Sequence, residues 1–232
     1  MQRTHFMALL ALGWLACNDG IEVTTDITVP ETRAAISLTE LASYYADTLP
    51  CASCEGIFTE LAILDDSTYF LSESYIGEQS QPLGSFGSFS REGDILTLGA
   101  ADDSARRFKI MEDRIVQLDK DGSEMITGLD YSLEQTTQPD NPVTRPFLTN
   151  GFLKIEKNQG IFQPCGLSKI WELISDNGVK EANRFFAKQA AKLAEGVFVR
   201  ATIELQPATD STGLTFQVKL NSVSEQLATG CQ

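Results

Sequence analysis

Histidine is nearly absent from this chain. The single histidine is His5, close to the N-terminus, and residues 17–232 contain none. Histidine is the usual general base beside a serine or cysteine nucleophile, and it is the commonest protein ligand of zinc. Residues 17–232 therefore cannot form a Ser-His-Asp triad, a Cys-His pair or a zinc site with histidine ligands.

Basic residues are also scarce. Lys and Arg together number 18, against 32 Asp and Glu, and the formal net charge is −14. Nucleic acids and anionic lipid headgroups are recognised through patches of positive charge. The charge balance therefore argues against both as partners, and we predict that the protein binds no nucleic acid.

Long apolar runs are rare, and the one that stands out lies at the N-terminus. It covers residues 6–16 (FMALLALGWLA), follows Arg3 and ends directly before Cys17. A membrane-spanning helix needs about 20 apolar residues, so this run fits the apolar core of a secretory signal better than a membrane span. We predict that residues 1–16 are a signal peptide.

The end of this run also indicates lipidation. Leu15, Ala16 and Cys17 resemble a lipobox, although Trp14 stands where leucine is usual. We predict that Cys17 is the acylated first residue of the mature protein, which would attach the protein to a membrane through a lipid anchor. The alternative is an ordinary signal peptide followed by an incidental cysteine.

The cysteine count supports this prediction. The chain has five cysteines, and an odd number in an exported protein needs an explanation. Lipidation of Cys17 leaves an even set, with Cys51 and Cys54 in a C-x-x-C and with Cys165 and Cys231 far apart in sequence. In an oxidising envelope we expect two disulfides, Cys51–Cys54 and Cys165–Cys231.

Composition divides the chain into segments. Residues 18–33 are polar and rich in threonine, as in a tether, and the stretch at 135–150 has three prolines and no periodic pattern. The predicted organisation is therefore a signal peptide (1–16), a tether (17–36), a first domain (37–134), a linker (135–150) and a second domain (151–232).

The first domain combines one expected helix with many short strands. Ser37 as a cap, Glu40 three residues later, and Leu38, Leu41 and Tyr45 on one face predict a helix over 37–48 that ends before Pro50. Alternating apolar residues between turn residues then predict strands at 58–64, 68–75, 85–90, 95–98, 108–111, 114–119 and 129–133. Such a series favours an antiparallel β-barrel, which has no exposed edges.

The second domain has a different order of elements. We expect strands at 152–156, 161–164 and 169–174, a helix at 179–194 that ends at Gly196, and strands at 197–206 and 214–223. Three strands, a helix and two strands are typical of a small Greek-key barrel of the OB type. The predicted class is mainly β.

Several motifs resemble one family. Residues 49–57 (LPCASCEGI) are similar to the LPCADCxGI segment that opens the barrel of NlpE-type envelope lipoproteins, also called copper resistance protein NlpE. Residues 130–133 (DYSL) and 162–165 (FQPC) also align in order, and Cys231 lies near the chain end, as its counterpart does. The resemblance covers most of residues 45–232.

The resemblance implies a fold and a set of roles. It implies a lipocalin-like first barrel, and it associates the protein with surface adhesion, copper tolerance and activation of the Cpx envelope-stress pathway, whose sensor histidine kinase would be the partner. Asn18 rather than aspartate after Cys17 favours the outer membrane, with the soluble part facing the periplasm.

Three interpretations of Cys51 and Cys54 stay open. A short-loop disulfide can staple the barrel and still act as a sensor, because an exposed bond is easier to reduce. The reduced pair offers two thiolates, which copper(I) accepts as ligands. A redox catalyst would need a helix N-terminus to lower the thiol pKa, whereas here a proline precedes the motif and a strand is expected after it.

These interpretations lead to one function and two alternatives. The leading hypothesis is a non-enzymatic, NlpE-like envelope lipoprotein in stress sensing, copper stress or adhesion signalling, with copper as its one candidate metal. The second hypothesis is a lipocalin-like carrier of a small apolar ligand, held in a cavity lined by Tyr69, Phe70, Phe86 and Phe89. The third is a C-x-x-C thiol–disulfide oxidoreductase.

Overall fold

A computed structural model of the chain describes residues 41–64, 67–78, 80–99, 105–137, 142–156, 159–174, 177–207 and 216–231. The predicted signal peptide, Cys17 and the tether lie outside these residues. The strands described below belong to one compact unit, Ala35–Gln232. The division into two domains at residues 135–150 stays a prediction.

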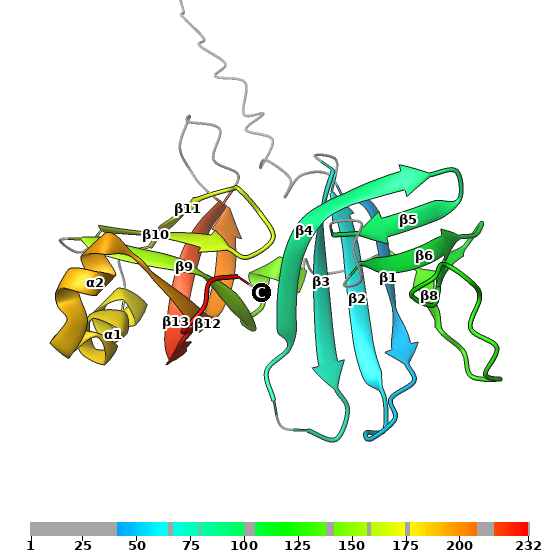
Figure 1. Cartoon of the computed structure of the whole chain (residues 1–232), viewed down its shortest axis with the longest axis horizontal. Helices are drawn as coiled ribbons and strands as arrows, with labels where there is room; N and C mark the ends of the chain where they lie inside the picture. The colour runs from blue at the N-terminus through cyan, green and yellow to red at the C-terminus, as the bar shows by residue number, and fades with distance from the viewer. Residues whose placement is uncertain are drawn as a thin grey trace, which may run out of the picture. The chain divides into compact units, whose positions relative to one another are not determined.

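The first barrel is a meander of consecutive antiparallel strands (Figure 1). Each strand pairs with the next one along the chain, from β1 to β8, and the pairing of β1 with β8 closes the sheet on itself. This architecture confirms the predicted antiparallel barrel. The strands are β1 (Leu41–Leu49), β2 (Ile57–Leu64), β3 (Thr68–Tyr75), β4 (Leu83–Glu92), β5 (Ile95–Leu98), β6 (Arg106–Ile110), β7 (Arg114–Gln117) and β8 (Ser132–Gln135).

The helix predicted at 37–48 is wrong where the structure describes it, because Leu41–Leu49 form strand β1. The neighbours Tyr44 and Tyr45 are both buried, but in two different clusters, as the opposite faces of a strand allow. Strand β1 pairs with β2 along its whole length and with β8 at Tyr45 and Ala46. Closing the sheet therefore outweighs the local helical pattern.

Inside the first barrel, apolar side chains of most strands pack together. Successive residues of a strand point to opposite faces, so residues two apart share the interior. On β3, for example, Tyr69 and Leu71 face inward, and Leu71 is only 3% exposed. The buried interior core consists of Tyr45, Leu49, Leu61, Ile63, Leu71, Leu96, Leu98, Phe108, Ile115 and Leu133.

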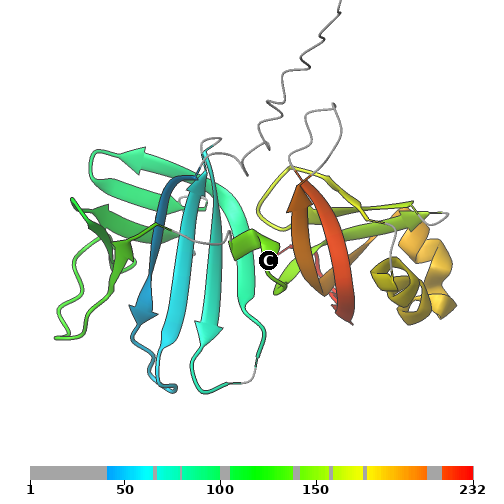
Figure 2. The same ribbon diagram turned by 180° about the vertical axis from the view of Figure 1, so that it is seen from behind.

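The second barrel has the strand order β9-β10-β11-β13-β12 and closes through the pairing of β12 with β9. Figure 2 shows this part of the chain from behind, with its later strands in orange and red. All its pairings are antiparallel except β11 with β13. This is the topology of an OB-type barrel, and it confirms the prediction. The strands are β9 (Phe147–Glu156), β10 (Gln159–Pro164), β11 (Trp171–Leu173), β12 (Val197–Pro207) and β13 (Phe216–Gln226).

The helical segment between β11 and β12 is broken where one helix was predicted. It consists of α1 (Asn177–Phe185), η2 (Ala187–Gln189) and α2 (Ala190–Glu195). The change of direction at Phe186 lets this ring and Leu193 both pack into the core, while Phe185 stays 51% exposed. Gly196 ends α2 at a φ of 108°, as predicted, and its N–H donates to the Lys192 carbonyl. No helix in the described part of the chain is long and apolar enough to cross a membrane.

A second core joins the outer face of the first barrel to the second barrel. The Phe147 ring lies 4.9 Å from the Phe70 ring and 5.7 Å from the Phe86 ring, and Phe86 lies 5.4 Å from Trp171. Gly84 makes room for this packing, because a side chain there would clash with the Phe147 ring. Strands β4 and β9 also pair in parallel at Leu83 and Leu148. A short 3-10 helix, η1 (Pro142–Thr144), precedes β9.

Candidate functional site

The C-x-x-C lies in the loop that joins β1 to β2. Pro50 follows the last residue of β1, and because proline has no N–H it cannot continue the ladder. Cys51 and Cys54 are bonded to each other, with their Cα atoms 5.3 Å apart. Both cysteines are half-buried, while Ala52 and Ser53 between them are exposed. The disulfide therefore lies on a surface loop that solvent reaches.

Backbone contacts fasten this loop to the neighbouring turn. The Ile76 N–H, just after β3, donates to the Gly56 carbonyl at 2.9 Å. Gly56 is buried, and a Cβ at this position would crowd the Thr48 side chain. The Cys54 sulfur lies 3.4 Å from the Gly56 carbonyl oxygen. Opening the disulfide would thus act on a loop that is held by β1, β2 and the β3–β4 turn.

The surroundings of the C-x-x-C differ from those of a redox catalyst. The loop leads into strand β2, so in the described part of the chain Cys51 does not lie at the start of a helix, where the dipole would lower its pKa. Glu55 is the only charged residue between Pro50 and Gly56, and it is acidic. Among the described residues, no group of three or more His, Cys, Asp or Glu side chains could hold a metal ion. A metal at this loop would rely on the two cysteine sulfurs.

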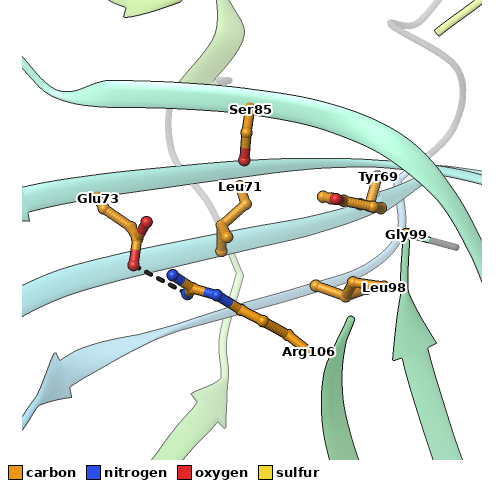
Figure 3. A pocket seen from close by; sticks show the side chains of 7 residues that line it. All are labelled: Tyr69, Leu71, Glu73, Ser85, Leu98, Gly99 and Arg106. Atoms are coloured by element: carbon orange, nitrogen blue, oxygen red, sulfur yellow. Dashed lines mark ion pairs between the residues drawn. The ribbon is translucent and has the colours of Figure 1, made fainter. Parts of the chain in front are cut away.

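A small pocket lies in the interior of the first barrel (Figure 3). It has a volume of about 210 Å³. Its lining comes from four neighbouring strands of the closed sheet: Tyr69, Leu71 and Glu73 on β3, Ser85 on β4, Leu98 and Gly99 at the end of β5, and Arg106 on β6. The alternation of the strands explains the set, because residues two apart share the inward face.

An ion pair crosses this pocket. In Figure 3 the Arg106 and Glu73 side chains point toward each other, and the Arg106 guanidinium lies 2.8 Å from a Glu73 carboxylate oxygen. The Arg106 side chain is 36% exposed and the Glu73 side chain is 16% exposed. Burial raises the pKa of the Tyr69 phenol nearby, and the positive charge of Arg106 opposes that shift.

A third candidate is the disulfide of the second barrel. Cys165 follows β10, and its N–H donates to the Asn150 carbonyl at 2.9 Å. Cys165 is bonded to Cys231 beyond β13, with the Cα atoms 5.3 Å apart. A surface groove of about 320 Å³ lies beside Cys231 and is lined partly by the rings of Phe152 and Phe198.

The structure assigns the predicted cavity residues to two places. Tyr69 lines the barrel pocket, and Phe89 packs against the interior core. Phe70 and Phe86 belong instead to the core that joins the two barrels, so placing them in an interior cavity is wrong. The reason is their position on β3 and β4, where they alternate with the inward residues.

Sequence reasoning missed Glu73 and Arg106. Both follow the inward pattern of their strands, since Glu73 lies two residues after Leu71 and Arg106 two residues before Phe108. Alternation alone could therefore have placed each charge inside the barrel. Their meeting could not be read from the sequence, because it depends on how β3 and β6 face each other in the closed sheet.

Comparisons with known proteins place the chain near one family. The family described as the NlpE N-terminal domain matches residues 45–128. Lipoprotein NlpE of Escherichia coli (strain K12) is 28% identical over 185 residues, which cover 78% of this chain and 75% of that protein.

Two solved structures are similar as well. A lipoprotein candidate from Shewanella oneidensis has 28% sequence identity and a TM-score of 0.38, and the match covers 43% of this chain and 92% of that one. The Cpx pathway activator NlpE from Escherichia coli has 21% identity and a TM-score of 0.34, with 81% of this chain and 95% of that one covered.

Proposed function

We propose that this chain, which is an NlpE-like envelope lipoprotein, reports redox or copper stress through the Cys51–Cys54 loop. The observation that carries the proposal is a disulfide of sequence separation 3 on a loop between β1 and β2, with exposed residues between its cysteines. A half-buried bond on a surface loop is open to reductants and metal ions, whereas a fully buried structural bond is shielded from them.

The first step of the proposal is reduction of this bond. A dithiol reductant transfers two electrons and two protons to Cys51 and Cys54, which become two thiols, and the reductant becomes a disulfide. The disulfide then no longer closes the loop, although the Ile76 N–H still donates its hydrogen bond to the Gly56 carbonyl. A change of this kind at one end of the barrel is the signal that we propose.

The second step is capture of copper. Thiolates are soft ligands, and copper(I) accepts two of them. Cys51 and Cys54 would hold the ion, with the loss of one proton from each thiol. The pair fits copper(I) better than zinc, since zinc in structural sites takes four ligands and residues 17–232 offer no histidine.

Membrane attachment and partner belong to the same proposal. Cys17 would carry the lipid anchor at the outer membrane and leave the described part of the chain in the periplasm. The Escherichia coli relative is known as a Cpx pathway activator. We extend this to the present chain, with a Cpx-type sensor histidine kinase as the partner, and the net charge of −14 speaks against nucleic acid.

The enzymatic alternative finds less support. A thiol–disulfide oxidoreductase activates its first cysteine at a helix N-terminus or beside a positive charge. The Cys51 loop leads into a strand and carries only Glu55 as a charged residue. We therefore expect the reduced protein not to turn over a disulfide substrate faster than a free dithiol does.

Copper(I) titration tests the proposal. With Cys165 and Cys231 both changed to serine, the reduced full chain in detergent should bind one copper(I) tightly through Cys51 and Cys54, and adding Cys51→Ser/Cys54→Ser should remove this binding. Ser53→Ala is the matched control, because it changes the same loop without removing a sulfur, and in the same background it should leave copper(I) binding unchanged. Equal copper(I) binding after Cys51→Ser/Cys54→Ser would refute the copper part of the proposal.

A further inference from the structure

We infer that the interior pocket of the first barrel binds a small zwitterion, a molecule that carries both a carboxylate and an ammonium group, between Arg106 and Glu73. This inference is independent of the proposed sensing function. It places a ligand site inside the barrel. The expected ligand is then not an apolar molecule but one that carries two opposite charges and no net charge.

The geometry of the ion pair is the first argument. In the closed sheet, β4 and β5 separate β3 from β6. The 2.8 Å contact between Glu73 and Arg106 therefore spans the interior of the barrel and does not follow its wall. In Figure 3 both charged groups reach into the same space below Ser85.

The second argument is the contrast with the rest of the interior. The buried interior of the first barrel holds no other charged side chain among the described residues; its buried polar groups are the Thr59 and Tyr45 hydroxyls. Charges are costly in such an interior unless they are paired, and an apolar pair of similar volume would fill the space at least as stably. A charged pair that water still reaches, with Arg106 36% exposed, is what an exchangeable ligand requires.

Charge balance then selects the class of ligand. An anion bound by Arg106 alone would leave the Glu73 carboxylate unpaired, and a cation bound by Glu73 would leave Arg106 unpaired. The Glu73 side chain is only 16% exposed, so leaving its carboxylate without a counter-charge is unfavourable. A zwitterion avoids this cost, because its carboxylate accepts from the Arg106 guanidinium while its ammonium group donates to Glu73.

The remaining lining sets the size and shape of the ligand. Leu71 and Leu98 offer an apolar surface beside the ion pair, and Ser85 adds a hydroxyl. The Tyr69 ring packs directly on Gly87, where a Cβ would lie 2.7 Å from it. The volume of about 210 Å³ is below the range of pockets for drug-sized molecules, so the ligand is of amino-acid size with a short apolar side chain.

Calorimetric titration of the full chain in detergent with L-leucine tests this inference. Two matched probes each lack one charge: 4-methylpentanoate has no ammonium group, and 3-methylbutylamine has no carboxylate. We expect leucine to bind at least tenfold more tightly than either. Equal binding of a singly charged probe, or no binding of leucine or of other aliphatic amino acids, would overturn the inference.

Variants locate the binding. Arg106→Gln and Glu73→Gln should each weaken leucine binding at least tenfold, while Arg107→Gln, one residue along β6 with its guanidinium on the Lys120 carbonyl, should not change it. If a single variant does not fold, the exchanged pair Glu73→Arg/Arg106→Glu keeps both charges and should bind leucine again. Undiminished binding by Arg106→Gln would place the ligand elsewhere and refute the site.

Discussion

Glu60 is a buried carboxylate that is held by two partners. Its side chain is 6% exposed, and one oxygen accepts from the Tyr44 hydroxyl at 2.5 Å and from the Arg145 guanidinium at 2.6 Å. Tyr44 lies on β1, and Arg145 follows η1, so the carboxylate connects two distant parts of the chain. A buried charge with such partners stabilises the fold only while they remain in place.

The first prediction concerns the Tyr44 hydroxyl. Tyr44→Phe removes a hydrogen bond to a buried charge, which should lower the free energy of unfolding by about 1.5–3 kcal/mol. Urea denaturation of the full chain measures this loss. Tyr45→Phe, the neighbour on the opposite face of β1, is the matched control and should cost less; a larger loss for Tyr45→Phe would contradict the role given to Glu60.

The second prediction is a pH dependence. Burial, followed by the hydrogen bond to Glu60, raises the pKa of Tyr44 above its ordinary value of 10.0. A raised pKa stabilises the fold below that ordinary value, and this contribution is lost as the pH rises above it, because only the unfolded tyrosine then ionises. The stability difference between wild type and Tyr44→Phe should therefore shrink from pH about 8 to about 11. A constant difference in urea denaturation would contradict it.

The local sequence pattern predicts some of the strands, whereas others depend on the closure of the barrel. The strands at Thr68–Tyr75 and Ile95–Leu98 have the bounds that alternation and turn residues predict. The sequence does not predict strand β1, because Leu38, Leu41 and Tyr45 have a helical spacing, whereas the closed sheet has a strand at Leu41–Leu49. The cysteines of the candidate site could be found from the sequence, whereas the meeting of Glu73 and Arg106 depends on tertiary structure.

The third prediction concerns β9, which supplies the ring that fills the core between the barrels. Phe147 is 1% exposed and contacts Phe70 and Phe86. Phe147→Ala should leave a cavity and lower the free energy of unfolding by about 3–5 kcal/mol. Phe185→Ala is the control, because that ring is 51% exposed and should cost far less. Similar losses for both variants would show that this core does not hold β4 and β9 together.

For the whole molecule, the two disulfides differ in the length of chain that they close. The sequence separation is 66 for Cys165–Cys231 and 3 for Cys51–Cys54. A bond that closes a longer loop restricts the unfolded chain more strongly. The Cys165–Cys231 bond therefore suits a structural role. The Cys51–Cys54 bond can open at a smaller cost to the free energy of unfolding, as a sensor requires.

The fourth prediction follows from this difference. Cys165→Ser/Cys231→Ser should lower the free energy of unfolding by about 2–4 kcal/mol, and Cys51→Ser/Cys54→Ser should lower it clearly less. Denaturation under non-reducing conditions compares the two variants directly. A larger loss for Cys51→Ser/Cys54→Ser would contradict this, and would identify the Cys51–Cys54 bond as the structural one.

The central claim is that Cys51 and Cys54 carry the signal, and an envelope-stress reporter in bacteria that produce the full chain tests it most directly. Copper or a dithiol reductant should raise the reporter in cells with the wild type or Ser53→Ala, but not in cells with Cys51→Ser/Cys54→Ser at equal protein level. A double serine variant that responds to both treatments as the wild type does would contradict the account.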